Sequence, residues 1–231
     1  IQIDAIPHIL LGKDIVGQAH TGTGKTAAFG LPVLNQLTGK NAEAVVIVPT
    51  RELAMQVSDE LFKFGKFLGI NTATVYGGQA YARQLKLIET ASVIVATPGR
   101  FLDLLKNGHI KIKPKFVILD EADEMLDMGF LDDIKEIFTY LPEDRQTLLF
   151  SATMPVAIKN LAKTILKEPE FVTITKSDVT NKNITQTFYV VDERERDDAL
   201  IRLFDYKNPK KSIIFCRTKK DVDRLSTFLL S

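Results

Sequence analysis

Short apolar runs that alternate with longer amphipathic stretches constrain the fold of this chain more than any other feature of its sequence. Several runs are apolar at every position, as in Val45–Val48, Val93–Ala96 and Phe116–Leu119. Strands buried on both faces of a parallel sheet have this pattern, whereas strands with one solvent face alternate apolar and polar residues. The other runs are Ile15–Val16, Thr72–Tyr76, Thr147–Phe150, Phe171–Ile174, Phe188–Val191 and Ile213–Cys216. The stretches between them, such as Glu52–Phe67, have helical spacing, so we predict an α/β fold with a doubly wound parallel sheet.

A polar stretch near the C-terminal end divides the chain. Residues 176–185, KSDVTNKNIT, contain no run that would build a core, so we interpret them as a linker. Residues 1–175 are then one domain. Residues 186–231 number about 46, too few to bury the core of an α/β domain, so we interpret them as the start of a second one. The chain begins on Ile1 and ends at Ser231, both in helical stretches, so we expect a fragment of a longer protein.

Composition excludes some kinds of site. The single cysteine, Cys216, excludes an intramolecular disulfide and a cysteine-based zinc site, and it fits a cytoplasmic protein. No apolar run approaches the roughly 20 residues that a membrane span needs, and no signal peptide is recognisable, so we expect no membrane partner. The net charge is +1. Any surface for nucleic acid must therefore be a local patch.

A glycine-bearing loop follows the first predicted strand and precedes a predicted helix at Ala27–Leu37. Its sequence, AHTGTGKT, occupies residues 19–26. Such a loop at a helix N-terminus presents backbone amides to phosphates, and the helix dipole favours the negative charge. We predict a nucleotide phosphate site in which Lys25 reaches the terminal phosphates and Thr26 binds magnesium. The phosphate-binding residues are Thr21, Gly22, Thr23, Gly24, Lys25 and Thr26; Ala19 departs from the glycine that opens the strict pattern, and a simple glycine-rich turn is the alternative.

Carboxylates follow the apolar run Phe116–Leu119 directly, in the order Asp120-Glu121-Ala122-Asp123. Ligands of open α/β sheets lie at the carboxyl ends of strands, which is where these side chains are expected. We interpret Asp120 as a magnesium ligand and Glu121 as the general base that orients an attacking water. The alternative is a solvated helix start, but the phosphate loop in the same predicted sheet favours a catalytic site.

The sequence DEAD at residues 120–123, after the phosphate loop, resembles the DEAD-box RNA helicase family. Further segments match family motifs in order, and the resemblance covers nearly the whole chain. It implies a RecA-like ATP-binding domain of a bacterial ATP-dependent RNA helicase, with adenine read by Gln2. It also implies coupling of hydrolysis to unwinding through Asp123, Ser151 and Thr153, and a second domain that opens at Ile214–Lys219. The RNA-contacting positions it implies are Pro49, Thr50, Arg51, Gly77, Gly78, Thr97, Pro98, Gly99 and Arg100.

The placement of these segments gives them a physical role of their own. Thr50-Arg51, Gly77-Gly78 and Thr97–Arg100 each follow a predicted strand and precede a predicted helix. They should share one edge of the sheet, where backbone amides, hydroxyls and guanidinium groups suit a row of phosphates. Contacts of this kind carry no sequence information, so we expect RNA binding with little sequence specificity. Ordinary turns and caps are the alternative for each segment taken singly.

Three alternatives to the helicase remain. Thr175–Asp178 and Thr218–Asp221 match the guanine-reading pattern of GTPases, although Asp14–Gly17 precedes the phosphate loop, the wrong order for one. An ATP-dependent RNA clamp of the same family and a DNA helicase are the others. The resemblance also implies an arginine finger in a His-Arg-containing motif, and the chain has no His-Arg dipeptide. We therefore expect weak turnover by this chain, and accessory proteins bound through other regions of the parent.

Overall fold

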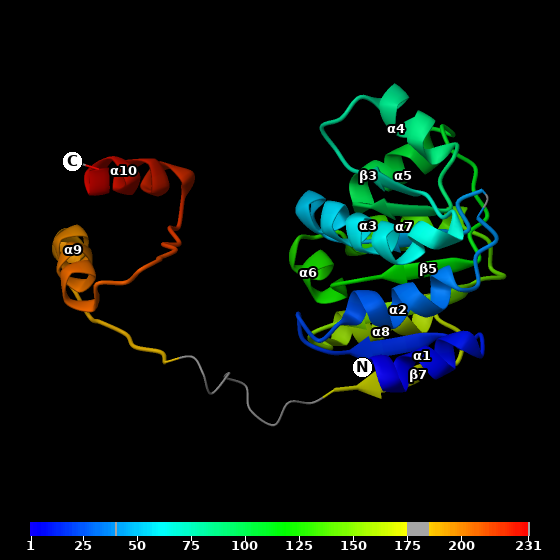
Figure 1. Cartoon of the computed structure of the whole chain (residues 1–231), viewed down its shortest axis with the longest axis horizontal. Coiled ribbons are helices and arrows are strands. Elements are labelled where there is room, and N and C mark those ends of the chain that lie inside the picture. The colour runs from blue at the N-terminus through cyan, green and yellow to red at the C-terminus, as the bar shows by residue number, and fades with distance from the viewer. Residues whose placement is uncertain (40, 175–184, 231) are drawn as a thin grey trace. The chain divides into compact units, whose positions relative to one another are not determined.

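The computed structural model describes residues 1–39, 41–174 and 185–230 (Figure 1). The chain divides into two units, Ile1–Lys176 and Ser177–Ser231. The expected linker at residues 176–185 lies outside the described residues except for its last position, Thr185. Each unit is described by itself below.

Within the described residues, the first unit contains one seven-stranded sheet with the order β3-β4-β2-β5-β6-β1-β7. Every pairing is parallel, which confirms the predicted doubly wound sheet. The strands are β1 (Ile15–Gln18), β2 (Ala44–Ile47), β3 (Thr72–Val75), β4 (Val93–Ala96), β5 (Phe116–Leu119), β6 (Gln146–Ser151) and β7 (Glu170–Thr173).

Helices cover both faces of this sheet (Figure 1). One face packs against α1 (Gln2–Leu10), α2 (Lys25–Leu34) and α3 (Arg51–Gly65), which is followed by a 3₁₀ turn at Lys66–Leu68. The other packs against α4 (Tyr81–Ile88), α5 (Pro98–Lys106), α6 (Ala122–Asp127), α7 (Leu131–Tyr140) and α8 (Val156–Ile165). Bounds differ slightly from expectation: the helix predicted to start at Ala27 begins at Lys25.

Two hydrophobic cores explain why the central strands are apolar throughout. Val46 packs in the core that contains Phe29 of α2, whereas its neighbours Val45 and Ile47 pack in the core that contains Phe101 of α5. Successive residues of a strand point to opposite faces, so a strand between two helical layers needs apolar residues at every position. The edge strand β7 is different: Phe171 is 71% exposed there. None of the described helices has both the length and the apolar character needed to cross a membrane.

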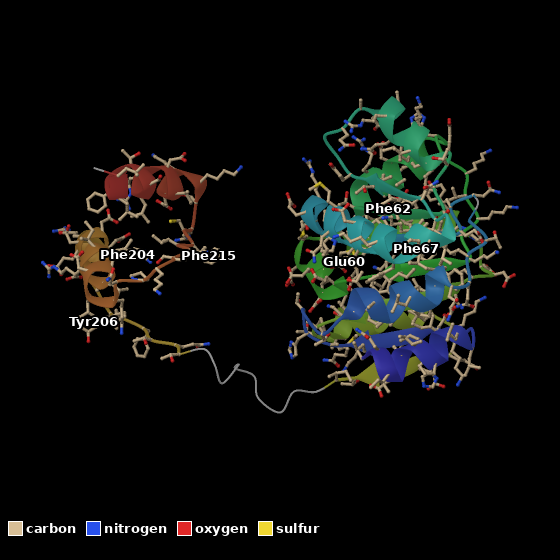
Figure 2. All side chains as sticks on the ribbon, viewed as in Figure 1. Glu60, Phe62, Phe67, Phe204, Tyr206 and Phe215 are labelled. Carbon is tan, nitrogen blue, oxygen red and sulfur yellow. The ribbon has the colours of Figure 1, made fainter. Side chains whose placement is uncertain are left out.

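The second unit corrects part of the sequence prediction. It contains a 3₁₀ turn (Glu193–Glu195), α9 (Arg196–Lys207) and α10 (Lys219–Leu230). The strands predicted at Phe188–Val191 and Ile213–Cys216 are wrong, because both runs lack regular secondary structure. Two of their aromatic side chains are exposed to solvent: Phe188 is 87% and Phe215 (labelled in Figure 2) is 91% exposed. A strand is stabilised by hydrogen bonds and side-chain pairs across a neighbouring strand, and residues 185–230 offer none.

Candidate functional site

The motif-bearing loops all follow strands at their carboxyl ends. The phosphate loop follows β1, the acidic sequence follows β5, and Ser151-Ala152-Thr153 begins at the last residue of β6. Thr50-Arg51, Gly77-Gly78 and Thr97–Arg100 come after β2, β3 and β4. Because the sheet is parallel throughout, these loops share one edge, and β5, β6 and β1 are consecutive strands there.

The phosphate loop has the backbone that its glycines permit. Gly22 and Gly24 have φ of 81° and 83°, in the left-handed region that glycine adopts without a Cβ penalty. Gly24 is the N-cap of α2, so the loop ends where the free amides of a helix begin. Thr23 donates its hydroxyl hydrogen to the carbonyl of His20 at 2.7 Å, which closes the turn. Thr21 and His20 are exposed, and Thr26 is half-buried.

A buried lysine faces a buried aspartate beneath this loop. Lys25 is 6% and Asp120 is 3% exposed, and Lys25 Nζ lies 3.8 Å from Asp120 Oδ1. Within the described part of the chain, the ammonium has no hydrogen-bond partner. Burial raises the pKa of Asp120 to about 6, although the positive charge of Lys25 opposes the shift. An ammonium that lacks acceptors at a helix N-terminus is suited to phosphate oxygens, because those supply the missing acceptors.

Glu121 has an unusual backbone for its residue type. Its φ and ψ are 56° and 51°, in the left-handed region, and it is the N-cap of α6. Its amide donates to Asp120 Oδ1 at 3.0 Å. A non-glycine residue in this conformation costs on the order of 1–3 kcal/mol and persists only where its surroundings hold it there. Asp120 and Glu121 are therefore fixed side by side at the strand end that faces the phosphate loop.

Asp123 connects the acidic loop to the loop after β6. Its Oδ2 accepts hydrogen bonds from the amide of Thr153 at 2.8 Å and from the Thr153 hydroxyl at 2.9 Å. Ser151 Oγ accepts from the amide of Asp123 at 3.2 Å and donates to the Thr153 carbonyl at 2.7 Å. Partial burial raises the pKa of Asp123, but the hydrogen bonds from this loop outweigh it and lower the pKa below its ordinary value. The structure thus joins Asp123, Ser151 and Thr153 in one network.

Gln2, at the start of α1, reaches the phosphate loop. Its Nε2 donates to the carbonyl of Gly24 at 3.3 Å. A Cβ at Gly24 would lie 2.4 Å from that nitrogen, so the glycine is needed for this approach as well as for its φ. The side chain of Gln2 therefore lies beside the phosphate loop, although the two are 22 residues apart in the sequence.

The loops after β2 and β3 contact each other through Arg51. A Cβ built on Gly78 would lie 3.0 Å from Arg51 Nη1, and the φ of Gly78 is +91°. Glycine at this position therefore admits the guanidinium against the backbone. Thr50 caps α3 by accepting from the amide of Leu53 at 3.2 Å, and its hydroxyl hydrogen can still be donated. Pro49 is buried, so its side chain packs in the fold and does not face solvent.

The loop after β4 is held by Arg100. Its Nη1 donates to the carbonyl of Gln79 at 3.0 Å and to Gln84 Oε1 at 3.3 Å, and its Nε lies 3.7 Å from Asp103 Oδ2. The side chain is half-buried, which makes it a brace between loops as much as an exposed cation. Thr97 and Pro98 are buried at the start of α5, with Gly99 following in its first turn.

Sequence reasoning missed Gln84 and Tyr81. Gln84 is fully buried and donates to the carbonyl of Tyr76 at 2.7 Å, and its side-chain oxygen accepts from Arg100. It therefore connects α4 to the Gly77-Gly78 loop and to Arg100. The Tyr81 ring lies 4.4 Å from the Arg100 guanidinium carbon, and its hydroxyl bonds Asp103. A signal was available for Gln84: it lies four residues before Ile88, on the face of α4 that packs inward.

The guanine-reading patterns receive a different explanation. Thr218–Asp221 forms the start of α10: the Thr218 hydroxyl accepts from the Asp221 amide at 3.1 Å and donates to Asp221 Oδ2 at 2.7 Å. These residues therefore cap the helix, and the side chains of Thr218 and Asp221 are hydrogen-bonded to each other. Thr175–Asp178 lies outside the described residues.

Comparison with known proteins identifies the family to which this chain is similar. The DEAD/DEAH box helicase family model matches residues 1–161. The DEAD-box ATP-dependent RNA helicase RhpA of Helicobacter pylori is 58% identical over all of this chain and 48% of its own length. CshA of Streptococcus pneumoniae, with the same description, is 49% identical over 98% of this chain and 44% of its own length.

A solved structure also matches, that of a DEAD box protein from the hyperthermophile Methanococcus jannaschii. Its TM-score is 0.74 and its identity 40%, over 99% of this chain and 62% of that protein. The chain spans about half the length of the curated relatives it matches. The family model covers well over half of the chain and the motifs meet at one sheet edge, so the chain belongs to the DEAD/DEAH box helicase family.

Proposed function

We propose that this chain is the ATP-binding core of an ATP-dependent RNA helicase, which couples ATP hydrolysis to local unwinding of duplex RNA in the cytoplasm. The observation that carries the proposal is the buried Lys25 ammonium, which has no hydrogen-bond partner among the described residues and lies between the phosphate loop and Asp120. A buried charge of this kind is costly unless a ligand completes its surroundings. The β- and γ-phosphates of a nucleotide supply both acceptors and negative charge there.

The residues present also fit magnesium bound together with a nucleotide. The described residues include no group of three or more His, Cys, Asp or Glu side chains that would hold a metal by themselves. Magnesium at phosphoryl-transfer sites is typically held by one or two protein groups plus phosphates and water. We assign that role to the Thr26 hydroxyl and the Asp120 carboxylate. The ion would neutralise charge that develops on the phosphates.

Glu121 completes the chemistry as the base beside this site. It follows Asp120 directly, and its strained backbone keeps the carboxylate at the edge of β5. In hydrolysis it would accept a hydrogen bond from the attacking water and orient the water towards the γ-phosphorus. Lys25 stabilises the charge on the phosphoryl oxygens as the bond to ADP breaks. Gln2, close to the same loop, would read the adenine edge with its amide.

RNA binding is assigned to the loops after β2, β3 and β4. Thr50, Arg51, Gly77, Gly78, Thr97, Gly99 and Arg100 supply helix N-termini, hydroxyls and guanidiniums at one edge. These groups suit phosphates and not base edges, so the expected binding is insensitive to sequence. Pro49 and Pro98 would act by shaping these loops, because both are buried.

Nucleotide competition tests the proposal. A fluorescent ADP analogue should bind the chain of residues 1–231, ATP should displace it, and GTP should not. Lys25→Ala should weaken binding of the analogue by tenfold or more, since a charged hydrogen bond is worth about 1.5–3 kcal/mol. Displacement by GTP as effective as by ATP would instead support a GTPase and sink the proposal.

We expect this chain to hydrolyse ATP slowly even with RNA. The family's arginine finger belongs to a His-Arg-containing motif, and no His-Arg dipeptide occurs in the 231 residues. Arginine fingers contribute a factor of about 10³ or more to phosphoryl-transfer rates. Turnover at helicase-like rates would contradict this expectation. An unwinding assay on the full-length parent separates the helicase from an ATP-dependent RNA clamp, which would bind RNA without unwinding it.

A further inference from the structure

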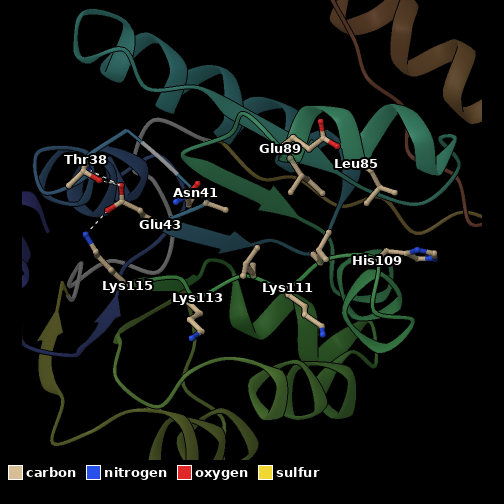
Figure 3. A pocket seen from close by; sticks show the side chains of 13 residues that line it. Thr38, Asn41, Glu43, Leu85, Glu89, His109, Lys111, Lys113 and Lys115 are labelled. Atoms are coloured by element: carbon tan, nitrogen blue, oxygen red, sulfur yellow. Dashed lines mark hydrogen bonds and ion pairs between the residues drawn. The ribbon is translucent and has the colours of Figure 1, made fainter.

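A groove of about 780 Å³ lies away from the nucleotide edge, at the amino ends of the strands (Figure 3). Ala42 and Glu43 line it just before β2 begins at Ala44, and Lys115 lines it just before β5 begins at Phe116. The loops of the proposed ATP and RNA sites follow the carboxyl ends of the strands in this parallel sheet. The groove therefore lies at the opposite edge of the sheet, and the proposed function leaves it unused.

The groove has an apolar floor between charged rims. Ile88 of α4 and Ile110 are buried in the floor, with Leu85 and Ile112 half-buried beside them. Lys111, Lys113 and Lys115 follow one rim, and Glu89 at the end of α4 lies across from them (Figure 3). Lys115 is paired with Glu43 at 2.6 Å. Lys111 and Lys113 are exposed, and among the described residues neither has an ion pair.

On the rim that carries the lysines, part of the described backbone also has no hydrogen-bond partner within the chain. The amide of Ile110 donates to Leu104 at 3.3 Å, and that of Lys115 donates to Glu43 at 2.7 Å. Between them, in this described stretch, the backbone groups of Lys111, Ile112 and Lys113 take part in no hydrogen bond within the chain. Lysines alternate with isoleucines here, as in a strand with one charged and one buried face. Unpaired backbone of this kind is a template for an added strand.

We propose that this groove binds an acidic segment of a partner protein in extended conformation, which pairs with residues 111–113 as an added strand. The backbone of the segment would bond the amides and carbonyls of Lys111 and Lys113. Its acidic side chains would face the two lysines, because opposite charges across a strand pair stabilise it, and its apolar side chains would enter the floor beside Ile112. The alternating pattern of 110–113 thus specifies an alternating acidic and apolar ligand.

RNA fits the groove less well than an acidic peptide does. None of the described residues that line it is an arginine, and its imidazole, His109, already packs against the Tyr81 ring at 5.4 Å. Single-stranded nucleic acid is held by basic grooves that add aromatic faces for the bases. The apolar floor is instead the complement of aliphatic side chains.

Amide exchange measured by NMR tests the proposal on residues 1–231 without nucleotide. The probe is a short acetylated peptide of alternating glutamate and valine, and its controls are a lysine–valine peptide and a short oligouridylate. The glutamate–valine peptide should slow exchange of the Lys111, Ile112 and Lys113 amides about fivefold when most of the chain is bound. Protection by oligouridylate without protection by this peptide would assign the groove to nucleic acid and overturn the proposal. No protection by any probe would overturn it as well.

A charge-reversed pair gives a second readout, fluorescence anisotropy of the labelled peptide. Lys111→Glu with Lys113→Glu should weaken binding roughly tenfold, because two attractions become repulsions. The matched control is Lys159→Glu with Lys163→Glu, two exposed lysines of α8, which should change the affinity less than about twofold. Equal losses in both variants would mean non-specific attraction to positive charge. Binding of an ADP analogue should be unchanged in either variant, which separates this test from that of the proposed function.

Discussion

At the scale of single residues, the site combines groups whose environments oppose their charge. Asp120 is 3% exposed, and burial raises its pKa to about 6 from an ordinary 3.8. The folded state therefore holds a proton on Asp120 between about pH 4 and pH 6, where the unfolded state has released it. Stability from this group is present at low pH and is lost as the pH rises through about 6.

Asp120→Asn removes this titration and isolates its effect. Between about pH 4 and pH 6, the free energy of unfolding of the variant should rise relative to the wild type, by an amount on the order of 3 kcal/mol, because two pKa units correspond to that energy. Urea unfolding in EDTA measures it at several pH values. A difference that does not change with pH would show that Asp120 titrates at its ordinary value.

The network around Asp123 yields a functional prediction. Replacing Ser151 and Thr153 with alanine removes two hydrogen bonds of Asp123. The Thr153 hydroxyl no longer donates to Asp123 Oδ2, and the Asp123 amide loses Ser151 Oγ as its acceptor. In a complete protein, we expect the double variant to hydrolyse ATP but not to unwind RNA, because the acidic loop keeps only backbone amides of the loop after β6 as partners for Asp123. ATPase and strand-displacement assays on the same preparation test this, and unimpaired unwinding would sink the idea.

At the scale of elements, α4 and the loop before it depend on a buried amide. Gln84→Leu should destabilise the fold by about 1–3 kcal/mol, because the Tyr76 carbonyl and one Arg100 donor lose their partner. It should also weaken RNA binding, since the Gly77-Gly78 loop and Arg100 lose a common anchor, while ADP affinity stays unchanged.

Gln36→Leu is the matched control for that variant. Gln36 is half-buried on the chain after α2 and donates only locally among the described residues, to the Pro32 carbonyl at 3.0 Å. Its replacement should leave RNA affinity as it is. Urea unfolding and RNA anisotropy, measured on both variants, separate a general loss of stability from a specific effect on the loop. Equal RNA affinity in both would contradict the role given to Gln84.

The elements also show what sequence alone predicts. Strands such as β2 and β5 were predictable because two helical layers require apolar residues at every position, and the order strand–loop–helix placed the motifs at one edge. Phe188–Val191 and Ile213–Cys216 have the same local pattern, yet they form no strand, because pairing depends on a neighbour that the pattern does not report. Gln84 and the brace at Arg100 were missed because their partners come from other elements, so only the tertiary structure reveals them.

At the scale of the whole molecule, the two units differ in how much they bury. The first unit contains both hydrophobic cores, one on each face of the sheet, between the strands and the helices that cover them. In the described part of the second, Leu225 is the buried hydrophobic residue, and the side chains of Phe188, Tyr206 and Phe215 are exposed. Its helices are joined by an ion pair between Arg224 and Asp197, a surface contact of little stabilising value.

This contrast predicts that the first unit folds and binds nucleotide by itself. A chain of residues 1–176 should unfold at the same temperature as residues 1–231 and bind an ADP analogue equally well, because burial of apolar area supplies most of the stability and resides in the first unit. The shorter chain also lacks the exposed aromatic side chains of the second unit, so it should aggregate less on heating. Calorimetry of both chains tests this, with analogue binding as the check on the site. A lower unfolding temperature for the shorter chain would mean that residues 177–231 contribute buried surface to the folded unit.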